Sequence, residues 1–151
     1  MNRRRLILAP LALFLTLLAA QRTWAHSFAL GTIEIGHPWA EPAVGDVAVL
    51  FMALANMGDK SDRLVGASTP IADAAVFENY GDHPVDHFEL QPKRPVALRP
   101  GGRHIALRGL KRRLAVGDSF PLTLRFAAAG STTVTVLVER GPEAPVQSPS
   151  R

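Results

Sequence analysis

The chain has 151 residues, of which 47% are hydrophobic and 20% charged, and it contains no cysteine. This length suits one domain, and the lack of cysteine excludes disulfides, thiolate metal sites and cysteine nucleophiles. Four of the 17 basic residues lie in residues 1–25, and the rest of the chain has equal numbers of acidic and basic residues. A nucleic-acid-binding protein is therefore not indicated, because the chain lacks both a basic excess and interleaved aromatic residues.

The charges are segregated along the chain. Residues 26–90 hold ten acidic and two basic residues, whereas residues 91–126 hold nine basic residues and one acidic residue. This distribution predicts a bipolar surface or two sheets that attract one another.

Residues 1–25 have the pattern of a cleavable export signal. Arg3-Arg4-Arg5 is a positive segment, Leu6–Ala20 is apolar, and Thr23-Trp24-Ala25 offers a cleavage site. The apolar run is too short for a confident membrane span. We therefore expect an exported, periplasmic protein without a membrane segment after cleavage; the alternative is an uncleaved N-terminal anchor.

Cleavage after Ala25 would make His26 the first residue of the mature chain. An N-terminal histidine can chelate copper through its α-amine and its imidazole together. The alternative for His26 is a frayed terminal residue without a ligand role.

The remainder of the chain predicts an all-β sandwich. About eight short segments rich in apolar and β-branched residues are separated by glycine and proline turns, with almost no helical periodicity. The expected strands are Phe28–Gly36, Val47–Asn56, Asp62–Ala67, Ala74–Tyr80, Arg94–Leu98, His104–Arg108, Phe120–Phe126 and Ser131–Glu139.

Alternation within these strands predicts which side chains are buried between two sheets. We expect one domain over residues 26–140, followed by a disordered tail over residues 141–151 that is rich in proline and serine. The expected buried residues are Trp39, Val49, Phe51, Leu64, Val76, Leu107, Leu122, Leu124, Val134 and Val136.

One histidine stands out beside a glycine-rich turn. Pro100-Gly101-Gly102 is a strong turn signal, and it is followed by His104, Ala106 and Arg108 in alternation with apolar residues. A lone histidine at the rim of a small sandwich is a candidate ligand. A structural histidine with its hydrogen bonds satisfied is the alternative.

The segment from residue 99 to 126 also resembles the periplasmic copper chaperone family PCu(A)C. Members of that family read close to Pro-Gly-Gly-x-His-x-Met-x-x-Gly-Leu-Lys-x-x-Leu-x-x-Gly-Asp-x-x-Pro-Leu-Thr-Leu-x-Phe. The matching residues are Pro100, Gly101, Gly102, His104, Gly109, Leu110, Lys111, Leu114, Gly117, Asp118, Pro121, Leu122, Thr123, Leu124 and Phe126.

The resemblance covers roughly residues 30–140 and implies a Greek-key, cupredoxin-like β-sandwich. It also implies a protein that holds Cu(I) with histidine and methionine and passes it to the copper centre of cytochrome oxidase. Soft thioether ligands suit Cu(I), and exposed labile ligands permit transfer.

The soft ligands of the family are missing here. Ala106 stands where the family has the methionine after His104. When the chain is aligned on Val76, Phe77 takes the place of the family's histidine and Asn79 that of a methionine. The methionine-bearing hairpin that follows in the family is shortened, and Phe88 falls near a further methionine position.

Two other histidines lie in this remodelled region. Asp82-His83 and Asp86-His87 form a small repeat, and an aspartate beside a histidine can orient its imidazole. We therefore predict a metal site made by His104 with His83 or His87. Such a site would bind Cu(I) more weakly than a complete family site and would favour Cu(II) or Zn(II). The alternative is that His83 and His87 face water in a polar hairpin.

Three functions follow from these observations. The first is a copper chaperone with an altered site, whose partner would be a cytochrome oxidase copper-centre subunit or another periplasmic copper protein. The second is a binding module that kept the fold and lost the metal. The third uses the N-terminal His26 for redox chemistry. No enzyme is predicted, because no nucleophile–base arrangement, catalytic carboxylate pair or phosphate loop is present in the sequence.

Overall fold

The computed structural model describes residues 27–141, which form eleven β-strands. The predicted signal peptide, His26 and nearly all of the predicted tail lie outside the described residues. Within residues 27–141 the chain forms no helix, so none is present that has the length and apolar character needed to cross a membrane. The strands are β1 (Ser27–Leu30), β2 (Ile33–Ala40), β3 (Val47–Asn56), β4 (Asp62–Ser68), β5 (Ala72–Asn79), β6 (His83–Val85), β7 (Phe88–Leu90), β8 (Val96–Leu98), β9 (His104–Leu110), β10 (Ser119–Phe126) and β11 (Gly130–Val138).

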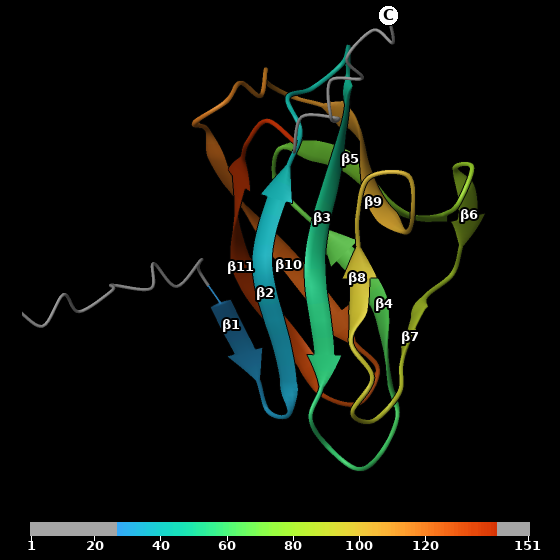
Figure 1. Ribbon diagram of the computed structural model, residues 1–151. Coiled ribbons are helices and arrows are strands. Elements are labelled where there is room, and N and C mark those ends of the chain that lie inside the picture. Colours follow the sequence, from blue (N-terminus) through green and yellow to red (C-terminus); the bar gives the residue numbers. More distant parts are fainter. Residues whose placement is uncertain (1–26, 142–151) are drawn as a thin grey trace, which may run out of the picture.

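The strands build two layers that are joined into one continuous sheet (Figure 1). The hydrogen-bonded order is β6-β5-β9-β3-β2-β11-β10-β4-β7, with β1 on β2 and β8 on β3. All pairings along this path are antiparallel except that of β11 with β2, which joins the layers through Leu137 opposite Trp39. The predicted all-β sandwich is confirmed.

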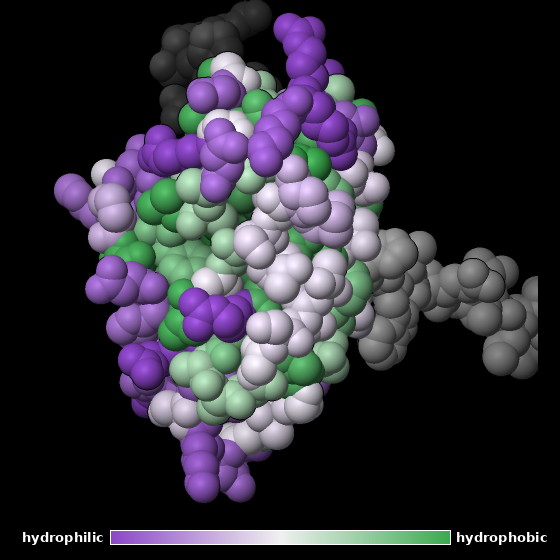
Figure 2. Space-filling model, turned by 180° about the vertical axis from the view of Figure 1, so that it is seen from behind, coloured by the Kyte–Doolittle hydropathy of each residue, from purple (hydrophilic) through white to green (hydrophobic). Residues whose placement is uncertain are grey.

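The outer side of the layer with β10 and β11 faces solvent. Serine and threonine alternate with buried valines along β11, as expected for an antiparallel sheet with one wet face. Seen from behind, pale side chains and green, hydrophobic ones share this face; one strongly hydrophilic group stands near its middle, and others gather at its margins and ends (Figure 2).

The observed strands differ from the predicted ones mainly by subdivision. The first predicted strand is broken at Gly31, which has a φ of 57°, so it becomes the hairpin of β1 and β2. The remodelled segment after β5 contains two further short strands, β6 and β7.

The core prediction was wrong for three residues. Trp39, Val49 and Val76 are only half-buried, and Phe51 is buried but lies outside the core cluster. Their immediate neighbours, such as Leu50 and Phe77, belong to that cluster. Successive side chains of a strand point to opposite faces. These four residues therefore belong to the outer face of the layer formed by β6, β5, β9, β3 and β2, here called the first layer. Apolar residues on both faces of β3 concealed the alternation.

Asp62, at the start of β4, ties that strand to the turn between β10 and β11. It is only 7% exposed. Its carboxylate accepts hydrogen bonds from the backbone N–H groups of Arg63, Ala128 and Ala129, at 2.7 to 2.9 Å. Burial alone raises the pKa of Asp62, but these backbone hydrogen bonds outweigh it and hold the pKa below its usual value of 3.8.

We predict that Asp62→Asn lowers the free energy of unfolding at pH 7 by about 2 kcal/mol, because an amide nitrogen would face a backbone donor. The folded-state pKa is depressed, so the stabilisation is present above the unfolded pKa and is lost as the pH falls through the folded pKa. In urea unfolding, the free energies of unfolding of the two proteins should therefore begin to converge as the pH falls below about 3.8. The exposed Asp59→Asn serves as the control and should match the wild type throughout; a difference independent of pH would contradict the ionic origin of the effect.

Candidate metal centre

A row of side chains crosses the outer face of the first layer over four neighbouring strands. Glu78 of β5 lies directly opposite His104 of β9, and Trp39 of β2 lies opposite Phe51 of β3. The ring centroids of Phe51 and His104 are 6.5 Å apart, and those of Trp39 and Phe51 are 4.7 Å apart. The aromatic pair therefore forms one wall of the environment around His104.

Strand alternation explains why the polar members of this row share a face. Phe77 and Ile105 are in the hydrophobic core cluster, so Glu78 and His104, their neighbours in the chain, point outward. Both are nevertheless buried, with 2% and 7% of their surface exposed. A buried carboxylate and imidazole need hydrogen-bonding partners.

Two turns close over the row. The β5–β6 hairpin reverses over residues 80–82, where Gly81 and Asp82 both have positive φ, 71° and 56°. Aspartate tolerates this left-handed conformation better than most residues. The β8–β9 turn lies beside the hairpin, since a Cβ added to Gly102 would stand 3.5 Å from the Tyr80 ring. The hairpin brings Asp82 back toward His104.

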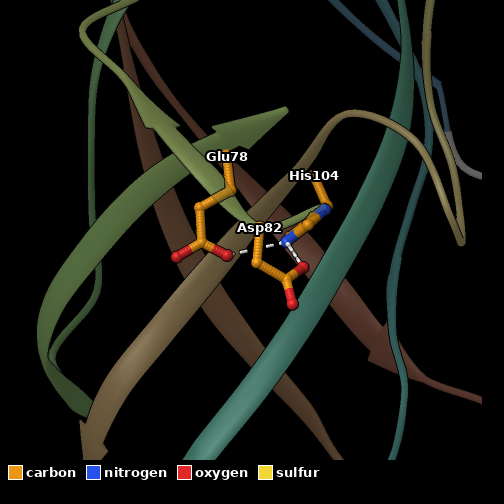
Figure 3. Close-up of side chains that lie close together, drawn as sticks. All are labelled: Glu78, Asp82 and His104. Carbon is orange, nitrogen blue, oxygen red and sulfur yellow. Dashed lines mark hydrogen bonds and ion pairs between the residues drawn. The ribbon is translucent and has the colours of Figure 1, made fainter. Parts of the chain in front are cut away.

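The imidazole of His104 is held from both sides. Its Nδ1 lies 2.8 Å from the carbonyl oxygen of Gly102, and its Nε2 lies 2.8 Å from Glu78 Oε2. The carboxylate of Asp82 approaches the same Nε2 at 3.5 Å (Figure 3). The ring orientation is thus fixed by a backbone carbonyl, while Nε2 faces two carboxylates.

Glu78 also contacts a positively charged side chain. Arg108 of β9 donates a hydrogen bond from its guanidinium to Glu78 Oε1 at 2.6 Å. Burial alone raises the pKa of Glu78, but the hydrogen bonds and charges of Arg108 and His104 outweigh it and lower the pKa. Glu78 is therefore an ionised carboxylate that is hidden from water.

These groups can hold a metal ion. One ligand atom each from Glu78, Asp82 and His104 lies within 4.8 Å of the other two, and they form the one such cluster of three among residues 27–141. Imidazole nitrogen and carboxylate oxygen suit Zn(II) and Cu(II), whereas Cu(I) prefers thioethers. Of the methionines in that range, Met52 is in the core cluster, and Met57 lies in the turn after β3, where its carbonyl contacts Lys93.

The predicted site residues are placed as follows. His104 belongs to this cluster, whereas His83 and His87 do not. His83 pairs with Asn79 and therefore belongs by alternation to the face opposite Glu78. His87 lies with its Nε2 3.7 Å from Glu89. Participation of His83 or His87 beside His104 stays a prediction.

Sequence reasoning missed Glu78 and Arg108 as members of the site, and it considered Asp82 only as an aspartate that could orient a neighbouring imidazole. Alignment on Val76 put Phe77 in the place of the family's histidine, but the residue beside His104 is Glu78, one position further along. The signal for it was weak, because Val76, on the same face as Glu78, is apolar like Ala75 and Phe77 on the opposite face.

Comparisons with known proteins agree with this fold. The family model described as "Putative lipoprotein LpqE-like" matches residues 33–138. The chain is 27% identical over 115 residues to "Putative lipoprotein Lxx21020" of Leifsonia xyli subsp. xyli, covering 71% of this chain and 69% of that protein.

Solved structures give the same result. The copper-bound PCuAC domain from PmoF2 superimposes with a TM-score of 0.72 at 31% identity, covering 77% of this chain and 99% of that domain. Cu(I)-bound DR1885 from Deinococcus radiodurans gives 0.62 at 25% identity, covering 82% and 87%. The predicted cupredoxin-like fold and the similarity to copper chaperone domains are thereby confirmed.

We predict that Glu78→Gln lowers the free energy of unfolding of the metal-free protein by about 2 kcal/mol at pH 7. The variant leaves His104 and Arg108 without their shared buried carboxylate, and breaking a buried pair is costly, although the half-exposed Arg108 can turn to water. The control is Asp82→Asn, whose side chain is 80% exposed and which should change stability by less than about 0.5 kcal/mol. Equal, small effects of both variants in denaturant unfolding would argue against an ionic network centred on Glu78.

Proposed function

Because this chain belongs to the LpqE-like family and has the fold of PCuAC domains, we propose that it is a copper-binding protein of chaperone type with an altered metal site. The observation that carries the proposal is the convergence of His104, Glu78 and Asp82 within 4.8 Å on this scaffold. A non-enzymatic role is supported indirectly, because the similar domains are copper-binding modules.

The donor set determines which ion the site would prefer. One imidazole and two carboxylates favour a divalent ion, Cu(II) or Zn(II), over Cu(I). The Glu78 side chain is buried, whereas the Asp82 side chain is exposed to solvent. An ion could therefore enter and leave the site from the Asp82 side. An accessible ligand of this kind is consistent with transfer of the metal to another protein.

We also propose that the protein is exported and delivers copper to an exported copper protein, of which the copper-centre subunit of cytochrome oxidase is the candidate. Export is supported by the lipoprotein description of the family and of the relative from Leifsonia xyli. An intact mass that includes residues 1–25 would contradict cleavage after Ala25 and a ligand role for the His26 α-amine. Transfer of copper to the purified metal-free subunit would test delivery, and retention of the metal would argue against it.

A second candidate function is a binding module that kept the fold and lost the metal. The observation in its favour is that the buried charges are already balanced: Arg108 and His104 both bond the Glu78 carboxylate. In this case the ionic network would replace the metal as the feature that holds β5 and β9 together.

Metal titration of the purified protein separates the two candidates. We predict that the wild type binds Cu(II) and Zn(II) in competition with a chromophoric chelator, and that its Cu(I) affinity is well below that of a domain with a complete set of histidines and methionines. His104→Ala should abolish binding and Glu78→Gln should weaken it at least tenfold, because each removes a ligand.

His83→Ala and His87→Ala are the discriminating variants in the same titration. Unchanged affinity in both would assign the site to Glu78, Asp82 and His104. A loss as large as that of His104→Ala in either variant would instead support a site shared among histidines. Failure of the folded wild type to bind any of the three ions would favour the metal-free module.

A further inference from the structure

The two oxygens of Glu78 have different partners. Oε2 lies 2.8 Å from His104 Nε2, on the side of the candidate ligands, whereas Oε1 accepts the 2.6 Å hydrogen bond from Arg108. The side chain of Glu78 is 3% exposed and that of Arg108 is 51% exposed. The buried anion is thus neutralised from the solvent side by a cation that can move.

The residue between His104 and Arg108 makes this contact possible. His104, Ala106 and Arg108 lie on one face of β9 because side chains of a strand alternate. Ala106 faces outward and yet is only 2% exposed, so neighbouring groups cover its methyl group. A longer side chain at this position would occupy the space between Arg108 and His104.

We propose that Arg108 is an internal counter-cation of the candidate metal site, which neutralises Glu78 in the metal-free protein and must leave it when a metal ion is bound. This inference rests on the proposed function. A guanidinium stays charged at all pH values at which proteins fold, so Arg108 cannot yield by losing a proton. It yields by turning its half-exposed side chain into water.

Competition of this kind lowers metal affinity and favours release. The guanidinium of Arg108 is hydrogen-bonded to one oxygen of Glu78. It also places a positive charge close to the position that an incoming cation would take, and the two like charges repel. When the ion departs, Arg108 returns to the carboxylate, so Glu78 is not left as an uncompensated buried charge. The Glu78 carboxylate can thus bind either the metal ion or the Arg108 guanidinium, and release of one is coupled to binding of the other.

The test compares Arg108→Gln, Arg108→Lys and a matched control. Glutamine removes the charge while keeping a hydrogen-bond donor, and lysine keeps the charge without the planar fork of donors. The control is Arg125→Gln, which removes the same charge from β10 in the other layer. Each protein is titrated with Cu(II) and with Zn(II) against a chromophoric chelator, after circular dichroism has confirmed the β fold.

We expect Arg108→Gln to bind at least about tenfold more tightly than the wild type, since a charge-assisted hydrogen bond no longer opposes the ion. Arg108→Lys should fall between them, and Arg125→Gln should stay within about twofold of the wild type. In the wild type labelled with ¹⁵N, the guanidinium signal of Arg108 should also move toward that of a solvent-exposed arginine on addition of Zn(II).

The outcomes separate this inference from the proposed function. Unchanged or weaker binding by Arg108→Gln, with a wild type that binds, overturns the counter-cation role and leaves the metal site standing. Binding by Arg108→Gln but not by the wild type supports the inference and shows that the natural chain is the metal-free module. Absence of binding in both proteins overturns both the inference and the metal site.

Discussion

Burial of the Glu78 carboxylate on the outer face of the sheet is the constraint on which the site depends. An ionised group that is removed from water needs compensating charge and hydrogen bonds, and Glu78 obtains them from His104 at one oxygen and Arg108 at the other. Both partners come from β9, the strand that pairs directly with β5. The network therefore fixes the position of β9 against β5 and, with Gly102, the direction in which the imidazole points.

The sequence predicts the fold well because the relevant signals are local. Glycine and proline turns, β-branched runs and alternation define most strands, and Val47–Asn56 is both a predicted strand and the observed β3. The signals fail where both faces of a strand are apolar. In β3, Val49 and Phe51 look like core residues, but they lie on the outer face, where Phe51 is part of the aromatic wall, while Leu50 and Met52 fill the core.

The site was harder to predict, because its residues come together through register. A shift of one residue along a strand moves a side chain to the opposite face. The alignment on Val76 placed Phe77 in the site, but Phe77 lies in the core and Glu78 is the residue opposite His104. The carboxylate beside His104 was therefore not predicted. The segregation of acidic residues before residue 90 from basic residues after it did hold useful information. It predicted attraction between charges, although between two sheets, whereas the Glu78–Arg108 ion pair joins the neighbouring strands β5 and β9.

Charge balance links the two candidate functions. Both ring nitrogens of His104 lie within hydrogen-bonding distance of oxygens, those of the Gly102 carbonyl and the Glu78 carboxylate. In the metal-free site, the carboxylates of Glu78 and Asp82 lie near the one guanidinium of Arg108. If an ion displaces that guanidinium, a divalent ion balances both carboxylate charges, whereas Cu(I) would leave one of them uncompensated. Because Glu78 is buried, this difference favours the divalent ion over Cu(I) on electrostatic grounds, in the same direction as the chemistry of the ligands.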